Sequence, residues 1–184
     1  MRWEALFADL EAELAAAESM EIAAEVADRS RWEIGRLTLV DRLLASVGGS
    51  ISISVAPGSA LVGRLQAAGP DWLLLDETAH RSALVPLRAV RSLAGLSAYA
   101  VAPGSEGLLQ SRLDLRYALR SLARGRADVV VVLVDGARLP GRIERVGADF
   151  IEMSEHPPDE PRRPVAGGAG RIIPVDALGT VLSG

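Results

Sequence analysis

The chain has 184 residues and 49% of them are hydrophobic, so it is long and apolar enough to bury two small cores. Its formal net charge of −4 excludes a general electrostatic attraction to nucleic acid or acidic membranes. Cysteine and lysine are both absent, which excludes disulfides, thiolate chemistry and a phosphate-binding loop of the Gly-x-x-x-x-Gly-Lys-Ser/Thr kind. Because no segment has the pattern of a signal peptide or a bilayer-spanning helix, we expect a cytoplasmic protein without membrane contact.

Residues 1–29 predict an acidic amphipathic helix. Its apolar stripe includes Trp3, Phe7 and Leu14, and its other faces carry Glu4, Asp9, Glu11, Glu13, Glu18, Glu21, Glu25 and Asp28. The stripe suits packing against the next helix or docking in a partner's groove. That next helix is predicted to begin at Ser30, because Ser30-Arg-Trp-Glu33 has the form of a capping box, and to end at Gly48-Gly49.

The period of the hydrophobic pattern then changes from helical to two. Ser50–Val55 alternates serine with an apolar residue, as a strand does with one buried face. Four more short strands are predicted: one after Gly58 that carries Leu61 and Leu65, one at Trp72–Leu75, one at Leu84-Val85 and one near Leu93. Pro86 suits a tight turn before the last of them. Five such strands in about 45 residues predict a small curled barrel rather than an open sheet.

The chain repeats this unit. Gly58-Ser-Ala-Leu-Val-Gly-Arg-Leu65 recurs as Gly136-Ala-Arg-Leu-Pro-Gly-Arg-Ile143, and Leu84-Val-Pro-Leu-Arg88 recurs as Ile172-Ile-Pro-Val-Asp176. The helix before each set of strands belongs to the repeat as well. The predicted domains are therefore residues 30–95 and 111–184, joined by a linker over residues 96–110. The second copy carries a longer, proline-rich segment over residues 154–170, which predicts a mobile loop.

The strand pattern resembles a known family. A hydrophobic strand, a glycine turn and a Gly-x-apolar second strand stand here as Val131-Val-Leu-Val-Asp-Gly136 and Gly141-Arg-Ile143. Together with the preceding helix, this pattern is similar to the Sm-like branch of the small SH3-like β-barrels, over residues 35–95 and 113–182. The resemblance implies a mainly β, or α+β, protein with two five-stranded Sm-like barrels. It also implies RNA binding, for which the family uses an acidic or amide residue after strand two and a basic-glycine step near strand four. Asp71 and Asp149 lie two residues beyond the position where the family has its acidic or amide residue. Val85-Pro86 and Ile173-Pro174 stand where the family has the basic-glycine step.

Arginines recur every fourth residue along the helix before the second set of strands. The candidate contact residues for nucleic acid or a protein partner are Arg112, Arg116, Arg120, Arg124 and Arg126. A solvated face, or pairing with the acidic N-terminal helix, explains the same stripe. No stacking aromatic residue accompanies the stripe except Tyr117, and modules that bind single-stranded RNA usually need several.

The first strand of the second copy is apolar on both faces. Its outward positions carry Val130, Val132 and Val134, where the first copy has Ser52, Ser54 and Ala56. A strand that is apolar on both faces is covered on both faces. The cover is either one of the chain's own helices or a barrel–barrel or subunit interface, and these three valines are the candidate packing interface.

Nothing in the sequence predicts catalysis. His80 and His156 are the two histidines and there is no cysteine, so no metal site is predicted. Gly-x-Ser-x-Gly does not occur, and no cofactor motif is present. We therefore predict a non-enzymatic protein-interaction or assembly module, with a protein partner or a homo-oligomer. An RNA-binding regulator that uses helix 112–124 and the barrel loops is the alternative.

Overall fold

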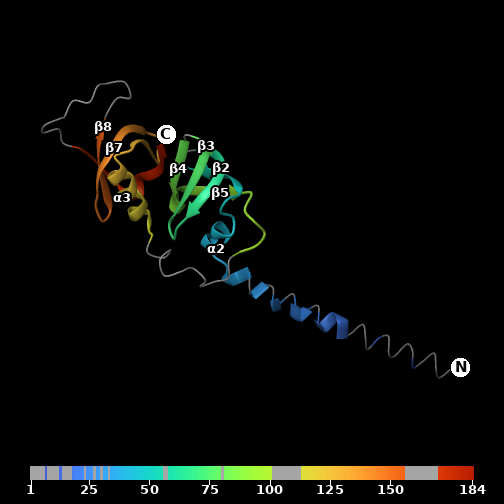
Figure 1. Ribbon diagram of the computed structural model, residues 1–184. Coiled ribbons are helices and arrows are strands. Elements are labelled where there is room, and N and C mark those ends of the chain that lie inside the picture. The colour runs from blue at the N-terminus through green and yellow to red at the C-terminus, as the bar shows by residue number, and fades with distance from the viewer. Residues whose placement is uncertain are drawn as a thin grey trace. The chain divides into compact units, whose positions relative to one another are not determined.

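The computed structural model describes residues 37–55, 58–79, 81–100, 113–155 and 170–184, together with part of the chain between residues 7 and 36 (Figure 1). The chain divides into two compact units, Met1–Thr38 and Leu39–Gly184. In the first unit, every described residue from 7 to 36 is helical, and the guanidinium of Arg36 lies 4.7 Å from the centroid of the Trp32 ring. The predicted capping residues Ser30 and Glu33 lie outside the described residues.

The described residues of the second unit form two short helices and ten strands. The first repeat comprises α2 (Leu39–Leu44), β1 (Ser50–Val55), β2 (Ser59–Ala68), β3 (Trp72–Thr78), β4 (Arg81–Pro86), the 3-10 turn η1 (Leu87–Ala89) and β5 (Val90–Ala94). The second comprises α3 (Leu115–Gly125), β6 (Asp128–Leu133), β7 (Arg138–Val146), β8 (Phe150–Glu155), β9 (Arg171–Pro174), η3 (Val175–Ala177) and β10 (Leu178–Ser183). The five strands predicted in the first repeat are thus confirmed.

All ten strands belong to one antiparallel sheet, which confirms a mainly β protein with few, short helices. The strand order is β5-β1-β2-β3-β4-β10-β6-β7-β8-β9. The sequence predicts two separate barrels, whereas the structure joins the strands of both repeats through β4 and β10, with β5 and β9 at the two ends. The sheet is not closed into a barrel.

The two halves of the sheet match each other in detail. In both halves the fifth strand pairs with the first, and a bulge interrupts this ladder near the strand ends, at Ser54/Val55 in one repeat and at Leu178/Thr180 in the other. The turns match as well: Gly58 and Gly136 have φ values of +82° and +93°, and each donates its N–H to a carbonyl three residues back at 2.9 Å. The repeated sequence therefore encodes a repeated backbone.

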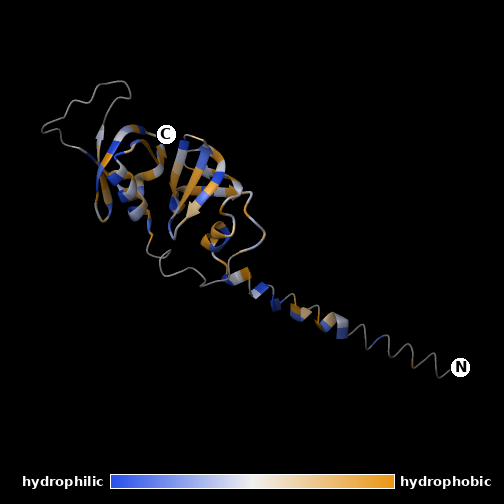
Figure 2. Ribbon diagram, viewed as in Figure 1, coloured by the Kyte–Doolittle hydropathy of each residue, from blue (hydrophilic) through white to orange (hydrophobic). Residues whose placement is uncertain are grey.

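Each repeat buries an apolar cluster beneath its own helix. Leu43 of α2 packs in the first cluster with Ile51, Ile53, Leu65 and Leu75. Leu115 and Leu119 of α3 pack in the second with Val131, Ile143 and Ile151. Figure 2 shows the alternation of apolar and polar residues along the strands that produces these buried faces.

Two predicted boundaries are corrected by the structure. Ser154 and Glu155, assigned to the mobile loop, are the last residues of β8. The Ser154 hydroxyl donates to Glu144 Oε1 at 2.8 Å, which favours continued strand pairing over a loop. Residues 156–169 lie outside the described part of the chain. The helix predicted to reach Val47 ends at Leu44, and the turn that follows leads to Gly48, at a φ of +87°.

Candidate protein interface

A short strand ladder of three opposed residue pairs joins the two repeats. Strands β4 and β10 run antiparallel with Leu84 opposite Val181, Ala83 opposite Leu182 and Ser82 opposite Ser183. At the end of this junction, Arg88 of η1 donates to the carbonyl of Val175 and lies 3.5 Å from Asp176 in η3. Backbone pairing and side-chain packing therefore hold the repeats together along one strand edge.

A row of apolar side chains crosses the junction without interruption. From β2 through β3, β4, β10, β6 and β7, the residues directly opposite one another are Ala67, Leu74, Leu84, Val181, Val131 and Leu139. All six pack in the second repeat's core, and Leu84 and Val181 expose only 4% and 1% of their surface. The first repeat thus contributes part of the second repeat's hydrophobic core.

On the opposite face of the sheet, the second repeat contributes side chains to the first repeat's core. Leu182 of β10 is buried in the first repeat's core cluster, and Val130 and Val132 of β6 are half-buried against it. These two valines are thus placed at the contact between the repeats. Val134 lies beyond the end of β6 and is 40% exposed, with its N–H donated to the carbonyl of Ala177.

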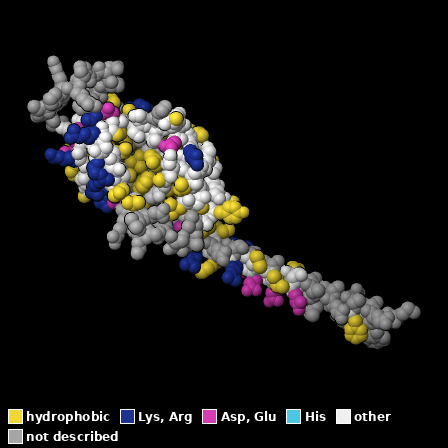
Figure 3. All heavy atoms as spheres, in the orientation of Figure 1, with side chains coloured by type: hydrophobic (Ala, Val, Ile, Leu, Met, Phe, Trp, Pro, Cys, Tyr) yellow, Lys and Arg dark blue, Asp and Glu magenta, His cyan; other side chains and the backbone are white. Residues whose placement is uncertain are grey.

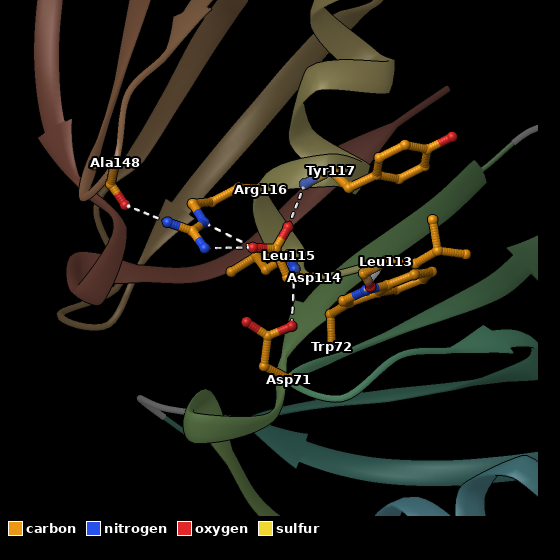
Figure 4. A network of polar contacts seen from close by, with 8 residues as sticks. All are labelled: Asp71, Trp72, Leu113, Asp114, Leu115, Arg116, Tyr117 and Ala148. Carbon is orange, nitrogen blue, oxygen red and sulfur yellow. Dashed lines mark hydrogen bonds and ion pairs between the residues drawn. The ribbon is translucent and has the colours of Figure 1, made fainter. Parts of the chain in front are cut away.

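Asp71 in the turn before β3 and Trp72 at the start of β3 also hydrogen-bond to the segment that leads into α3 (Figure 4). Asp71 Oδ1 accepts the N–H of Leu115 at 2.8 Å, and the indole Nε1–H of Trp72 donates to the carbonyl of Leu113 at 2.6 Å. The Leu115 N–H belongs to the first turn of the helix, where backbone donors lack intrahelical partners. Asp71, named in the sequence analysis only for its place near the acidic position of the Sm-like pattern, therefore anchors the second repeat's helix.

The second repeat has no counterpart for this junction at its own outer edge. Strand β9 pairs with β8 in the register that β4 has with β3, but it ends the sheet, and no described strand adjoins its other side. Ile172, the equivalent of Leu84, is 63% exposed. Asp149 is exposed and Phe150 half-buried, at the positions of Asp71 and Trp72. Sequence reasoning missed Ile172, although the aligned repeat places it opposite the buried Leu84.

The arginine stripe lies on the solvent side of α3. Arg116, Arg120, Arg124 and Arg126 are all exposed, and Figure 3 shows cationic side chains gathered over this helix. Arg112 lies outside the described residues. Arg116 pairs with Asp114 at 2.6 Å and reaches the carbonyl of Ala148 at 3.4 Å, and Arg124 lies 5.8 Å from the Tyr117 ring centroid. Arg126 caps the helix in the left-handed region at a φ of 49°. Arginines near a helix C-terminus also stabilise the helix, because their positive charge interacts favourably with the negative end of the helix dipole.

The N-cap of α3 is a carboxylate with a shifted pKa. Asp114 is half-buried, and this desolvation raises its pKa, but the N–H of Tyr117 and the adjacent guanidinium of Arg116 outweigh it and leave the pKa below its usual value. A carboxyl whose pKa is lower in the folded state contributes stability at pH values above its unfolded pKa, and this contribution is lost as the pH falls through the folded pKa.

We therefore expect Asp114→Ala to reduce the free energy of unfolding by about 1 kcal/mol at pH 7, the usual value of an N-cap. The difference between wild type and variant should begin to shrink as the pH falls below about 4, the ordinary pKa of an aspartate, and should shrink further as the pH falls through the lower pKa of folded Asp114. Urea denaturation of both proteins at pH 7 and pH 3 measures this. An equal difference at both pH values would contradict a charged cap.

The described residues contain no group of three or more metal-ligating side chains, and among them no helix is long and apolar enough to cross a membrane. Both histidines lie outside the described residues. Comparison with protein-family models and with curated proteins finds no match to this chain. The geometry of the sheet edge and of α3 is therefore the basis for inferring function.

Proposed function

We propose that the chain is a non-catalytic protein-interaction or assembly module, built from two Sm-like barrels, whose contact edge is strand β9. The observation that carries this proposal is the exposure of Ile172 on an edge strand whose counterpart, β4, is paired and buried. An edge strand with free backbone donors and acceptors pairs readily with a strand of another chain, and an exposed apolar side chain adds affinity.

The Sm-like part of the proposal is supported by the strand order. Each repeat places its strands as fifth, first, second, third and fourth, preceded by a helix that packs on the apolar cluster. Gly63 and Gly141 lie at the same place in the long second strand of each repeat. A glycine there lets a strand bend sharply, as a small barrel requires.

The contacts of the arginines and the charge of the second repeat favour a protein partner over RNA. Arg116 is already paired with Asp114, and the guanidinium of Arg124 lies over the Tyr117 ring. Residues 111–184 contain eleven arginines and ten acidic residues, so the second repeat has almost no net positive charge. Counterion release on phosphate binding scales with the number of cations that contact phosphate, and here acidic residues of the same repeat offset the arginines.

Site-specific photo-crosslinking tests the proposal. A photoreactive amino acid is placed at Ile172, at Val62 as a control of similar exposure on β2, and at Arg120 in the stripe. After irradiation in the native cell, we expect protein adducts that survive RNase from position 172 and few from position 62. Adducts that appear mainly at position 120 and disappear with RNase would overturn the proposal in favour of RNA binding.

A further inference from the structure

We infer that the helix of the first unit pairs with the same helix of a second copy of this chain, as an antiparallel coiled coil in which Glu13 of one copy lies opposite Arg31 of the other. This inference goes beyond the proposed function, because it uses a different surface from the β9 edge. The described residues from 7 to 36 are helical, and all of them are exposed. A helix that buries no face is marginal in water, so its apolar side chains call for a partner.

A seven-residue repeat runs through the sequence of the first unit. Glutamate recurs at every seventh position, as Glu4, Glu11, Glu18 and Glu25. If these glutamates are b positions of a heptad, the a positions carry Trp3, Leu10, Ala17, Ala24 and Arg31, and the d positions carry Leu6, Glu13, Met20, Ala27 and Ile34. Eight of these ten residues are apolar, and the repeat is longer than the about three to four heptads that indicate a coiled coil. A strict period of seven favours supercoiling around a second helix.

The seam formed by these a and d positions is open to solvent in a single chain. Met20 and Ile34, both at d positions, expose 75% and 67% of their surface. Figure 3 shows apolar and acidic side chains exposed along this helix. The recurring glutamates are at b positions, which face away from the seam, so they keep the helix soluble without entering the contact. Docking of the acidic face on an arginine stripe would instead leave the apolar seam uncovered.

Two charged residues interrupt the seam, and they have opposite signs. A parallel pair would place Glu13 against Glu13 and Arg31 against Arg31, and desolvated like charges are strongly unfavourable. In an antiparallel pair, the a positions of one helix meet the d positions of the other, and one such register places Glu13 opposite Arg31. The same register sets Leu10 opposite Ile34, Ala17 opposite Ala27, and Met20 opposite Ala24. Charge complementarity therefore selects both the direction and the register.

The resulting contact is long enough for a specific pair. Residues 10–34 cover about 36 Å of helix at 1.5 Å per residue. The four kinds of layer each occur twice about a two-fold axis, so six of the eight layers are apolar. Alanines near the axis let the two helices approach closely. Glu21, at an e position, meets Glu21 of the second copy beside the axis, so the association is expected to be reversible.

Sedimentation of the full chain over a range of concentrations gives the first test. We expect the mass to rise to at least that of two chains. Met20→Asp, in the seam, should raise the dissociation constant about tenfold or more through lost apolar burial. Ile22→Asp is the matched control, because Ile22 is 62% exposed on the same helix but at an f position outside the seam, and it should leave the dissociation constant unchanged. One chain's mass at every concentration, or equal losses from both variants, would overturn the inference.

Ile172→Asp separates this surface from the β9 edge. In this variant the mass should still reach that of two chains, because β9 takes no part in the coiled coil. If Ile172→Asp abolishes the association and Met20→Asp does not, the copies join through β9 and the coiled coil is wrong, while the proposed function stands. If the two-chain mass persists but position 172 crosslinks to no protein, the proposed function is wrong and the coiled coil stands.

A double-mutant cycle tests the register. Residues 13 and 31 lie about 27 Å apart along one helix, so coupling between them requires a second copy. Glu13→Arg and Arg31→Glu should each raise the dissociation constant about tenfold. Arg31→Glu also removes the ion pair that Arg31 forms with Asp28, so recovery is measured against this variant. The double variant should associate about tenfold more tightly than Arg31→Glu alone, whereas additive losses would refute the register.

Because the chain has no cysteine, introduced cysteines report the direction of the helices. A mixture of Leu10→Cys and Ile34→Cys chains should form a mixed disulfide dimer under mild oxidation. Ile34→Cys alone should not, because its two copies lie about 36 Å apart in the antiparallel pair. Crosslinking of Ile34→Cys with itself would indicate parallel helices and overturn the inference. Circular dichroism confirms that each variant is folded.

Discussion

Trp72→Ala is expected to lower the free energy of unfolding by about 3–5 kcal/mol, the usual cost of removing a large buried aromatic side chain. The ring is 9% exposed and packs in the second repeat's core, although Trp72 belongs to the first repeat. Its indole N–H also holds the carbonyl of Leu113 ahead of α3. The variant therefore loses a core side chain and the anchor of a helix together. Urea denaturation followed by circular dichroism measures the change.

Two further variants separate the contributions. Trp72→Phe keeps most of the ring but removes the donor, and it should cost about 1 kcal/mol for the hydrogen bond alone, plus any packing loss. Phe150→Ala, at the equivalent position of the second repeat, should cost clearly less than Trp72→Ala, because Phe150 is half-buried and belongs to neither core cluster. An equal loss from Phe150→Ala would mean that the junction does not explain the importance of Trp72.

Most of the local structure was predictable from the sequence, because it depends on short-range signals. Alternation over Ser50–Val55 reproduces the bounds of β1, and Pro86 places the 3-10 turn η1 directly before β5. The repeat predicted that the second half would copy the first, as its matching registers show.

The joining of the repeats was not predictable in the same way. The residues that make the junction, such as Leu84 and Leu182, have the pattern of ordinary buried strand positions in each separate repeat. Only the differences between the two copies indicate where the repeats join. Glu152 stands where the first copy has Leu74, and Val130 stands where it has Ser52. The sequence showed that strand β6 is covered on both faces, but either a helix or another strand system satisfies that pattern. The exposure of Ile172 depends on which edge ends the sheet, and this is a property of the tertiary arrangement.

Gly141→Ala is expected to be severely destabilising, by about 3 kcal/mol or more, because overpacking a tight contact with backbone cannot be relieved by a rotamer change. A Cβ at this position would lie closer than 3.0 Å to the carbonyl oxygen of Ser154 on β8. The equivalent Gly63 has the same relation to Asp76 on β3, so Gly63→Ala should behave similarly. The repeated glycine thus sets how closely the second and third strands approach in both halves of the sheet.

Gly125→Ala provides the matched control, since a Cβ there meets no atom within 4 Å and the residue lies at the end of α3. Alanine favours helix over glycine by up to about 1 kcal/mol, so this variant should be neutral or more stable. Thermal unfolding of the three variants ranks them. If Gly141→Ala melts within a degree or two of wild type, β7 and β8 must be able to separate locally. The sharp bend proposed for the barrel would then not depend on this glycine.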